Sequence, residues 1–280
     1  MRMRITENDF QSFAALLVSE DRGPGTTVKY LRDVRTFAAW LNHRPLTPET
    51  AAGWKEHLLH SGYAVVTINS MLSAVNRFLG SLGREDCKLR FLRVQRRSFR
   101  DQSRDLNKSE YQRLLDTAQS RGQERLELLM ETICSTGIRV SEVRYVTVEA
   151  ARNGRAEISL KGKIRTILLP SRLCRKLLKY ARKHKTASGE IFLTRNGKSI
   201  SRRQIWREMK QLCQKAGVEA SKVFPHNLRH LFALSFYRAC KDIVKLADIL
   251  GHSSINTTRI YLVTTGAEHA RQLEKLGLVT

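Results

Sequence analysis

Two short segments of this 280-residue sequence combine arginine with side chains that can orient it or transfer protons. In "STGIRVSEV", Arg139 and Glu142 are three residues apart, so one helical turn would place them side by side. In "PHNLRH", the same spacing joins His226 to Arg229, and His230 follows directly. A guanidinium offers a planar pair of donors to two oxygens, and an imidazole adds a donor that titrates near neutral pH. These residue types therefore favour binding of a phosphate.

A third segment, "LGHSSINTTRIY", places His252 and Tyr261 nine residues apart. On one unbroken helix these side chains would lie on opposite faces. Gly251 and the two serines after His252 predict that one helix ends and another begins here, so the histidine and the tyrosine belong to different segments. Taken alone, the tyrosine is more typical of half-buried packing than of chemistry, and the Arg139–Glu142 pair is typical of an ordinary surface ion pair.

The two histidines of "HNLRH" also have the spacing of a metal-binding pair. We consider phosphate chemistry the better interpretation, because Arg229 places a fixed cation beside the imidazoles and no carboxylate follows closely in sequence. Cleavage of a phosphodiester without a metal ion needs a nucleophile, cations for the non-bridging oxygens and a proton for the departing 5′ oxygen. Tyr261, the two arginines and a lysine or histidine are suited to these three tasks.

The elements around these motifs follow from the sequence pattern. Helical periodicity surrounds the motifs, whereas "AEISLKGKIRTILLP" alternates and is rich in β-branched residues, which predicts a hairpin around a Lys-Gly-Lys turn. A second short extended piece is expected in "GEIFLTRNGKSIS". The predicted fold class is mainly α, with this small β region in the second of two domains.

With these motifs in order, the sequence resembles the tyrosine site-specific recombinases of the phage integrase and XerC/XerD type. "TGIRVSE" is similar to the first arginine motif of that family, "HNLRH" to its His-x-x-Arg motif, and "LGHSSINTTRIY" to its Leu-Gly-His segment and nucleophile. The resemblance implies a catalytic set made of Tyr261, Arg139, Lys161, His226, Arg229 and His252. It implies a supporting set of Glu142, Lys163 and His230. Whether Lys161 or Lys163 is the general acid stays open, because the hairpin offers both.

The resemblance also implies a mechanism and an assembly. Two domains would form a clamp around a double-stranded DNA recombination site, and the tyrosine would form a 3′-phosphotyrosyl intermediate. Four copies, or copies paired with a related recombinase, would exchange strands on two sites through a Holliday junction. No metal, cofactor or small-molecule substrate is expected. A type IB topoisomerase, which shares this chemistry, and a catalytically idle DNA-binding protein are the alternatives.

Composition supports a nucleic-acid partner. Fifty Lys and Arg against 26 Asp and Glu leave a net charge of +24, which favours a polyanion. The sequence is 41% hydrophobic, enough for packed cores, but contains no apolar run long enough to span a membrane. Its five cysteines are scattered and form no CxxC pair, so neither a disulfide framework nor a zinc cluster is indicated. We expect a cytoplasmic protein.

The expected organisation has three parts. The pattern predicts a helical domain over residues 1–93, a polar linker over residues 94–106, and a second domain over residues 107–280 that ends in a tail helix. The resemblance implies that the first is a SAM-like core-binding domain and the second the catalytic domain. The tail helix is expected to dock either on its own core or on a neighbouring protomer. The predicted DNA contacts of the first domain are Lys29, Arg32, Arg35, Lys55 and Arg77.

Overall fold

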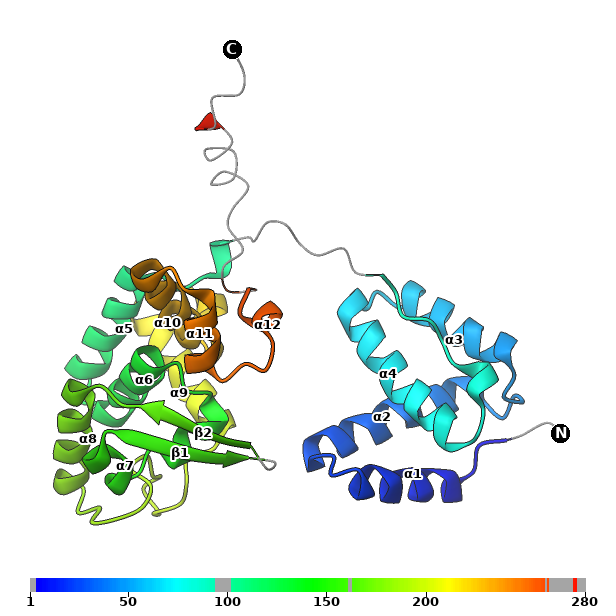
Figure 1. Ribbon diagram of the computed structural model, residues 1–280, viewed down its shortest axis with the longest axis horizontal. Coiled ribbons are helices and arrows are strands. Elements are labelled where there is room, and N and C mark those ends of the chain that lie inside the picture. The colour runs from blue at the N-terminus through cyan, green and yellow to red at the C-terminus, as the bar shows by residue number, and fades with distance from the viewer. Residues whose placement is uncertain (1–3, 94–101, 161–162, 260, 262–273, 276–280) are drawn as a thin grey trace. The chain divides into compact units, whose positions relative to one another are not determined.

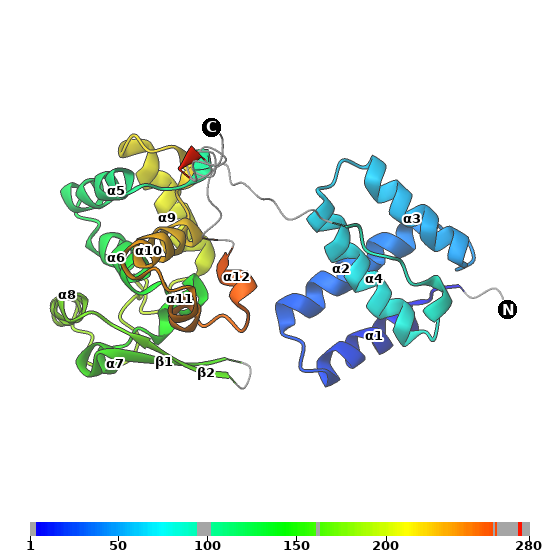
Figure 2. The ribbon, with the colours of Figure 1, turned by 45° about the horizontal axis from the view of Figure 1, so that its top comes forward.

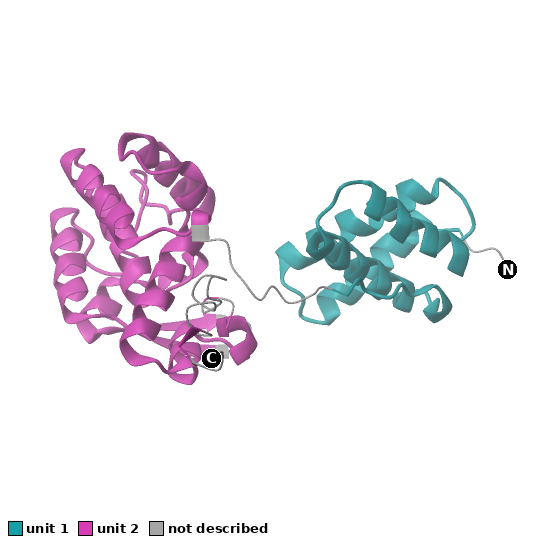
Figure 3. Cartoon of the chain, turned by 90° about the horizontal axis from the view of Figure 1, so that it is seen from above, with its two compact units in different colours: residues 1–96 teal, residues 97–280 magenta. Residues whose placement is uncertain are grey.

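In the computed structural model the chain divides into two compact units, residues 1–96 and 97–280 (Figure 3). The structure describes all residues except 1–3, 94–101, 161–162, 260, 262–273 and 276–280. Each unit has its own hydrophobic core. The expected tail helix falls almost entirely outside the described residues, as does most of the expected linker.

The first unit is helical throughout its described part (Figure 1). Its elements are α1 (Glu7–Ser19), α2 (Pro24–Leu41), α3 (Pro48–His60), α4 (Val65–Ser81) and the short 3-10 helix η1 (Glu85–Cys87). Helix α4 packs against α2 and also contacts α1 and α3. Aromatic pairs fill the space between the helices, with ring centroids 5.2 Å apart for Phe13–Phe78 and 5.7 Å apart for Phe37–Trp54. The prediction of a helical first domain is confirmed.

The second unit is mainly helical and contains the two strands. Its described helices are α5 (Lys108–Ser120), α6 (Glu124–Thr136), α7 (Val148–Asn153), α8 (Ser171–Lys183), α9 (Arg202–Lys215), α10 (Pro225–Cys240), α11 (Ile243–Leu250) and α12 (Ile255–Arg259). Short 3-10 helices are η2 (Gln102–Arg104), η3 (Val140–Tyr145) and η4 (Ala220–Lys222). Helix α6 packs against both α8 and α10 and lies between them in Figures 1 and 2.

The predicted hairpin is present as β1 (Arg155–Leu160) and β2 (Lys163–Leu168). The strands pair antiparallel, from Arg155 opposite Leu168 to Leu160 opposite Lys163. Side chains alternate as expected for a half-buried sheet, with Ile158 and Ile167 buried in the core. The second extended piece forms only isolated bridges, because the chain turns back at Thr194–Gly197 before a ladder can develop.

The ends of three helices place the segments that matter for chemistry. Helix α6 ends at Gly137 (φ 64°) and α11 ends at Gly251 (φ 62°), both in the left-handed conformation that favours glycine. A Cβ at Gly137 would lie 2.5 Å from Phe232 and 2.9 Å from Leu250, so α6 ends in direct contact with α10 and α11. Helix α10 begins with Pro225 at its first position, as predicted.

All five cysteines are free. Cys87, Cys174 and Cys213 are buried, Cys134 is half-buried, and Cys240 at the end of α10 is exposed. Burial raises the pKa of Cys87 to about 11 and the pKa of Cys134 to about 12. No helix in the described part of the chain combines the length and apolarity needed to cross a membrane.

Candidate active site

The predicted motifs meet where α6, α10 and α11 come together. The guanidinium of Arg229 donates to the carbonyl of Gly137 and, over 2.8 Å, to the carbonyl of Leu250. Arg139 donates to the carbonyl of Gly251 over 3.3 Å. These bonds join segments that are up to 112 residues apart in sequence, so the three motifs form one site.

Glu142 orients Arg139. One carboxylate oxygen of Glu142 accepts from the Arg139 backbone amide over 2.9 Å, and the other accepts from Arg139 Nη1 over 2.9 Å. The Glu142 side chain is buried, whereas the Arg139 side chain is 40% exposed. The buried carboxylate therefore fixes the backbone amide and one guanidinium nitrogen of Arg139. The rest of the Arg139 guanidinium remains accessible to a ligand.

Arg229 is buried almost completely. Burial lowers the pKa of Arg229, and the neighbouring Arg139 lowers it further, while hydrogen bonding to Tyr261 acts in the opposite direction. Its second terminal nitrogen also lies 2.9 Å from His252 Nε2. Because arginine has an intrinsic pKa above 12, a lowered value still leaves a cation at neutral pH. The site thus contains a permanent, positioned positive charge.

His252 is held as a neutral imidazole. A guanidinium can only donate, so His252 Nε2 must accept from Arg229. The ring proton then resides on Nδ1, which donates to the Thr258 hydroxyl over 2.8 Å. Burial, together with Arg229 and Arg139, lowers the pKa of His252 to about 4. The ring therefore remains uncharged across the neutral range.

Tyr261 lies among three imidazoles. Its ring centroid is 5.8 Å from His226, 5.2 Å from His230 and 5.8 Å from His252, and the last pair is stacked at 10°. The Tyr261 residue is 5% exposed and packs with Leu250 and other apolar residues of α10 and α11. The tyrosine and the histidine that are nine residues apart in sequence thus face each other, as the predicted break at Gly251 requires.

The two candidate lysines of the hairpin have no described side chains. Lys161 lies outside the described residues, and for Lys163 the structure describes the backbone alone, paired with Leu160 in the hairpin. The hairpin residue whose side chain enters the site is Arg165 on β2. It donates to the Leu250 carbonyl, and its Nη2 lies 3.3 Å from a Glu142 carboxylate oxygen.

Sequence reasoning missed Arg165 and Thr258. A signal for Arg165 exists in the alternation of the hairpin, because it shares the inward parity of Ile167 and faces Ile158 across the strands. An arginine on an otherwise apolar face needs a polar partner. Thr258 is fully buried, but the sequence gives no comparable signal for it. Two adjacent threonines lie in this short helix, and the sequence pattern does not indicate which of them faces inward.

The histidine pair of α10 also has the spacing of a metal-binding pair. Among the residues that the structure describes, no group of three or more His, Cys, Asp and Glu side chains is arranged to hold a metal ion. His226 and His230 are instead placed around the Tyr261 ring, with Arg229 on the same helix.

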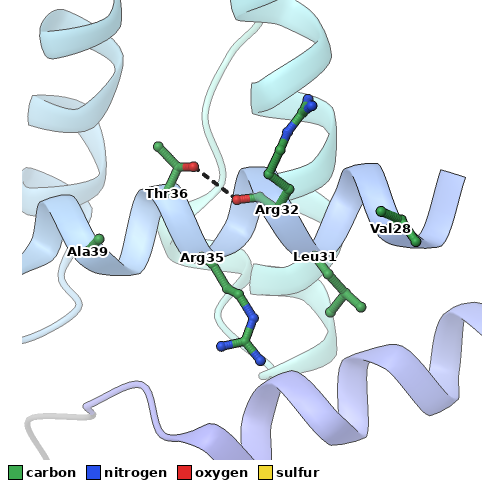
Figure 4. A pocket seen from close by; sticks show the side chains of 6 residues that line it. All are labelled: Val28, Leu31, Arg32, Arg35, Thr36 and Ala39. Carbon is green, nitrogen blue, oxygen red and sulfur yellow. Dashed lines mark hydrogen bonds between the residues drawn. The ribbon is translucent and has the colours of Figure 1, made fainter. Parts of the chain in front are cut away.

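The predicted DNA contacts of the first unit are mostly ion-paired. Four of the five are bound to acidic neighbours: Lys29 and Arg32 to Asp33, Arg35 to Glu7, and Arg77 to Glu20. Lys55 on α3 is half-buried. Figure 4 shows Arg32 and Arg35 pointing to different sides of α2, where they line an open pocket. Both side chains are more than half exposed, so phosphates can reach them, and their role stays a prediction.

Comparison with known proteins places the site in a family. Residues 104–267 match the phage integrase family, and residues 10–86 match the phage integrase N-terminal SAM-like domain. The chain belongs to the phage integrase family. The family match covers all three motifs, the hairpin and Tyr261.

Relatives of similar length are tyrosine recombinases. Tyrosine recombinase XerA of Thermococcus kodakarensis is 28% identical over 275 residues, which cover 95% of this chain and 93% of XerA. Tyrosine recombinase XerD of Vibrio cholerae is 26% identical over 267 residues, which cover 89% of this chain and 88% of XerD.

Solved structures share the fold. The XerH site-specific recombinase bound to its difH substrate has a TM-score of 0.67 at 18% identity, covering 96% of this chain and 89% of XerH. The lambda integrase tetramer bound to a Holliday junction has a TM-score of 0.72 at 17% identity, covering 92% of this chain and 77% of that one.

The family match and the curated relatives confirm three predictions. These are the family, the mainly helical fold with a SAM-like domain, and the enzyme class, a tyrosine recombinase that cleaves and exchanges DNA strands.

Proposed function

We propose that this phage integrase family member cleaves a double-stranded DNA recombination site with Tyr261 as the nucleophile. The observation that supports it best is the placement of the Tyr261 ring between the imidazole of His252 and two histidines of α10, beside buried Arg229. The tyrosine oxygen would attack phosphorus, forming a 3′-phosphotyrosyl bond and breaking the bond from phosphorus to the 5′ oxygen.

Each remaining group of the site has a task in this step. Arg139 and Arg229 would neutralise the charge that grows on the non-bridging oxygens, a task that other phosphoryl-transfer enzymes give to magnesium. His226 and His230, whose rings lie against Tyr261, are suited to receive the tyrosine proton. Neutral His252 would orient Arg229. As long as His252 Nε2 accepts the hydrogen bond from Arg229, this nitrogen cannot donate to a phosphate oxygen. Glu142 would hold Arg139.

The departing 5′ oxygen needs a proton. We propose Lys161 as its donor, with Lys163 as the competing choice, on the resemblance of the hairpin to the family's lysine hairpin. The free 5′ hydroxyl of a second strand would then attack the phosphotyrosine, reversing the bond changes and releasing Tyr261. No metal ion or organic cofactor is required by this balance of bonds and protons.

The assembly follows from the same chemistry. One protomer cuts one strand, so exchange between two duplexes requires four active sites. We propose that four protomers, or two pairs with a related recombinase, act on two sites through a Holliday junction. The relatives support this, since XerH is bound to its difH site and lambda integrase forms a tetramer on a Holliday junction. We further propose that the two units clamp the duplex, and that the protein acts in the cytoplasm.

The test is a covalent trapping experiment. A DNA duplex with a nick near the cleavage position loses its 5′-hydroxyl fragment after cutting, so the phosphotyrosyl adduct accumulates and survives SDS. Wild type should form the adduct, whereas Tyr261→Phe should bind the same DNA with nearly unchanged affinity and form none.

Tyr237→Phe is the matched control, because Tyr237 packs against the same apolar cluster as Tyr261. It removes a hydroxyl without removing the proposed nucleophile, so its adduct level should stay near wild type. An SDS-resistant adduct from Tyr261→Phe, or its loss from Tyr237→Phe alone, would reject the assignment. Exchange between two sites, as opposed to relaxation of one supercoiled plasmid, would then distinguish recombinase from topoisomerase activity.

A further inference from the structure

Arg165 connects the two predicted arginines of the site. It shares the Glu142 carboxylate with Arg139, whose Nη1 is 2.9 Å from one oxygen while Arg165 Nη2 is 3.3 Å from the other. It shares the Leu250 carbonyl with Arg229, since both guanidiniums donate to that oxygen. A change at Arg165 therefore reaches both Arg139 and Arg229 through common acceptors.

The charge around Arg165 is unbalanced. Arg139 and Arg165 pair with the Glu142 carboxylate, and Arg229 meets Arg165 at the Leu250 carbonyl, so these three cations and one anion carry a net charge of +2. The Arg165 side chain is 14% exposed, and its buried Nε has no hydrogen-bond partner among the described residues, while Nη2 has the ion pair with Glu142 but no hydrogen bond. Burial lowers the pKa of Arg165 to about 10, and Arg229 and Arg139 act in the same direction, so it is still a cation at neutral pH. Buried donors and excess positive charge are both satisfied by an anion.

The neighbouring turn is built to admit this side chain. A Cβ at Gly251 would overlap the Cδ and Nη1 atoms of Arg165 and lie 3.0 Å from Nε. Glycine at this position thus serves two purposes, the left-handed backbone that ends α11 and the space that Arg165 occupies. The arginine is accommodated between the hairpin and the turn that carries His252.

We propose that Arg165 is a third cation of the phosphate site, which stabilises the charge on the scissile phosphate during cleavage and keeps Arg139 and Arg229 at a fixed separation. This inference rests on the proposed function, because it assumes that Tyr261 attacks a phosphodiester in this site. A cation beside the non-bridging oxygens contributes most when their charge is largest, at the pentacoordinate transition state. Removal of Arg165 should therefore slow cleavage more than it weakens DNA binding.

A substrate without the charge provides the test. In a methylphosphonate, a methyl group replaces one non-bridging oxygen, so the scissile group is neutral and needs less cationic stabilisation. On the ordinary phosphodiester at saturating DNA, Arg165→Gln should form the covalent adduct on the order of 10- to 100-fold more slowly than wild type. On the methylphosphonate, the same variant should be within about 3-fold of wild type, and Arg165→Lys should fall between the two on the phosphodiester.

Comparing two substrates with one protein preparation removes the effect of partial unfolding, since the active fraction cancels. Arg155→Gln is the matched control, because Arg155 lies on the same hairpin with a side chain 61% exposed and paired to Glu157. If Arg165→Gln slows adduct formation equally on both substrates, Arg165 has only a structural role and the proposal is overturned. The proposal is also overturned if the variant forms the adduct at the wild-type rate on both substrates. If wild type forms no adduct on any substrate, or Tyr261→Phe forms one, the proposed function itself fails.

Discussion

Substitution of Gly251 by alanine should damage the site far more than the same change at another helix end. Two penalties add at Gly251. An alanine in the left-handed conformation costs roughly 1–2 kcal/mol. Its Cβ would also overlap Arg165, whose displacement would break a charged hydrogen bond to Leu250 and an ion pair to Glu142. A hydrogen bond to a charged group is worth about 1.5–3 kcal/mol, so the total should be about 2.5–5 kcal/mol.

Gly154 is the matched comparison. It ends α7 with φ 68°, close to the 62° of Gly251, and a Cβ there would meet no atom within 4 Å. Gly154→Ala should therefore show the backbone penalty alone, about 1–2 kcal/mol. The measurement is native-state hydrogen exchange of the core amides of α6 and α10, which reports unfolding of the second unit.

A double-mutant cycle with Arg165→Ala isolates the steric part. Once the arginine side chain is removed, Gly251→Ala has nothing to displace, so its penalty should fall to the level of Gly154→Ala. Equal penalties for Gly251→Ala in the presence and absence of Arg165 would refute the reasoning. So would a penalty at Gly251 no larger than that at Gly154 in the unmodified background.

Three further predictions concern the chemistry of the site. Since the pKa of His252 is about 4 when folded and about 6.5 in an unfolded chain, the unfolded state binds more protons between these values, and stability should fall as pH drops from about 6.5 toward 4. In urea unfolding, His252→Gln should reduce the dependence of the free energy of unfolding on pH in this range. An unchanged dependence would contradict the lowered pKa of His252. Adduct formation should persist in EDTA, and Arg139→Ala or Arg229→Ala should slow it by about 10²–10³-fold or more; activity abolished by EDTA and restored by magnesium would reject this. A bridging 5′-phosphorothiolate, whose sulfur departs without a proton, should restore cleavage by Lys161→Ala but not by Arg139→Ala. If Lys163→Ala is instead the variant that is inactive on the ordinary substrate and restored on the phosphorothiolate, Lys163 is the general acid.

Helix ends and motif positions were predictable because local chemistry determines them. Pro225 opens α10 and Gly137 closes α6, as their fixed or permissive backbone conformations imply. Gly251 separates α11 from the segment with Tyr261, which allows His252 and Tyr261 to stack. These features depend on residues within a few positions of each other, so the sequence pattern suffices.

Contacts across the fold were not predictable in the same way. The shared Leu250 carbonyl depends on how α10, α11 and β2 pack, and a backbone oxygen carries no sequence signature. The buried hydroxyl of Thr258 fixes the His252 tautomer, but a threonine in a short helix gives no hint of that partner. The ion pairs of Arg32 and Arg35 illustrate a related limit, because basic residues expected to face DNA first bind acidic neighbours in their own unit.

The uneven accessibility of the cysteines has a practical consequence for spectroscopy. Only Cys240 is exposed, while burial raises the thiol pKa of Cys87 and Cys134 and so suppresses the reactive thiolate at both. A maleimide fluorophore should therefore label the unaltered sequence at Cys240 alone. That residue ends α10, and His226 is the second residue of the same helix, so the two are roughly 21 Å apart at 1.5 Å per residue. The distance suits energy transfer to a dye on DNA, so arrival of a duplex at the tyrosine can be timed without altering any residue near it.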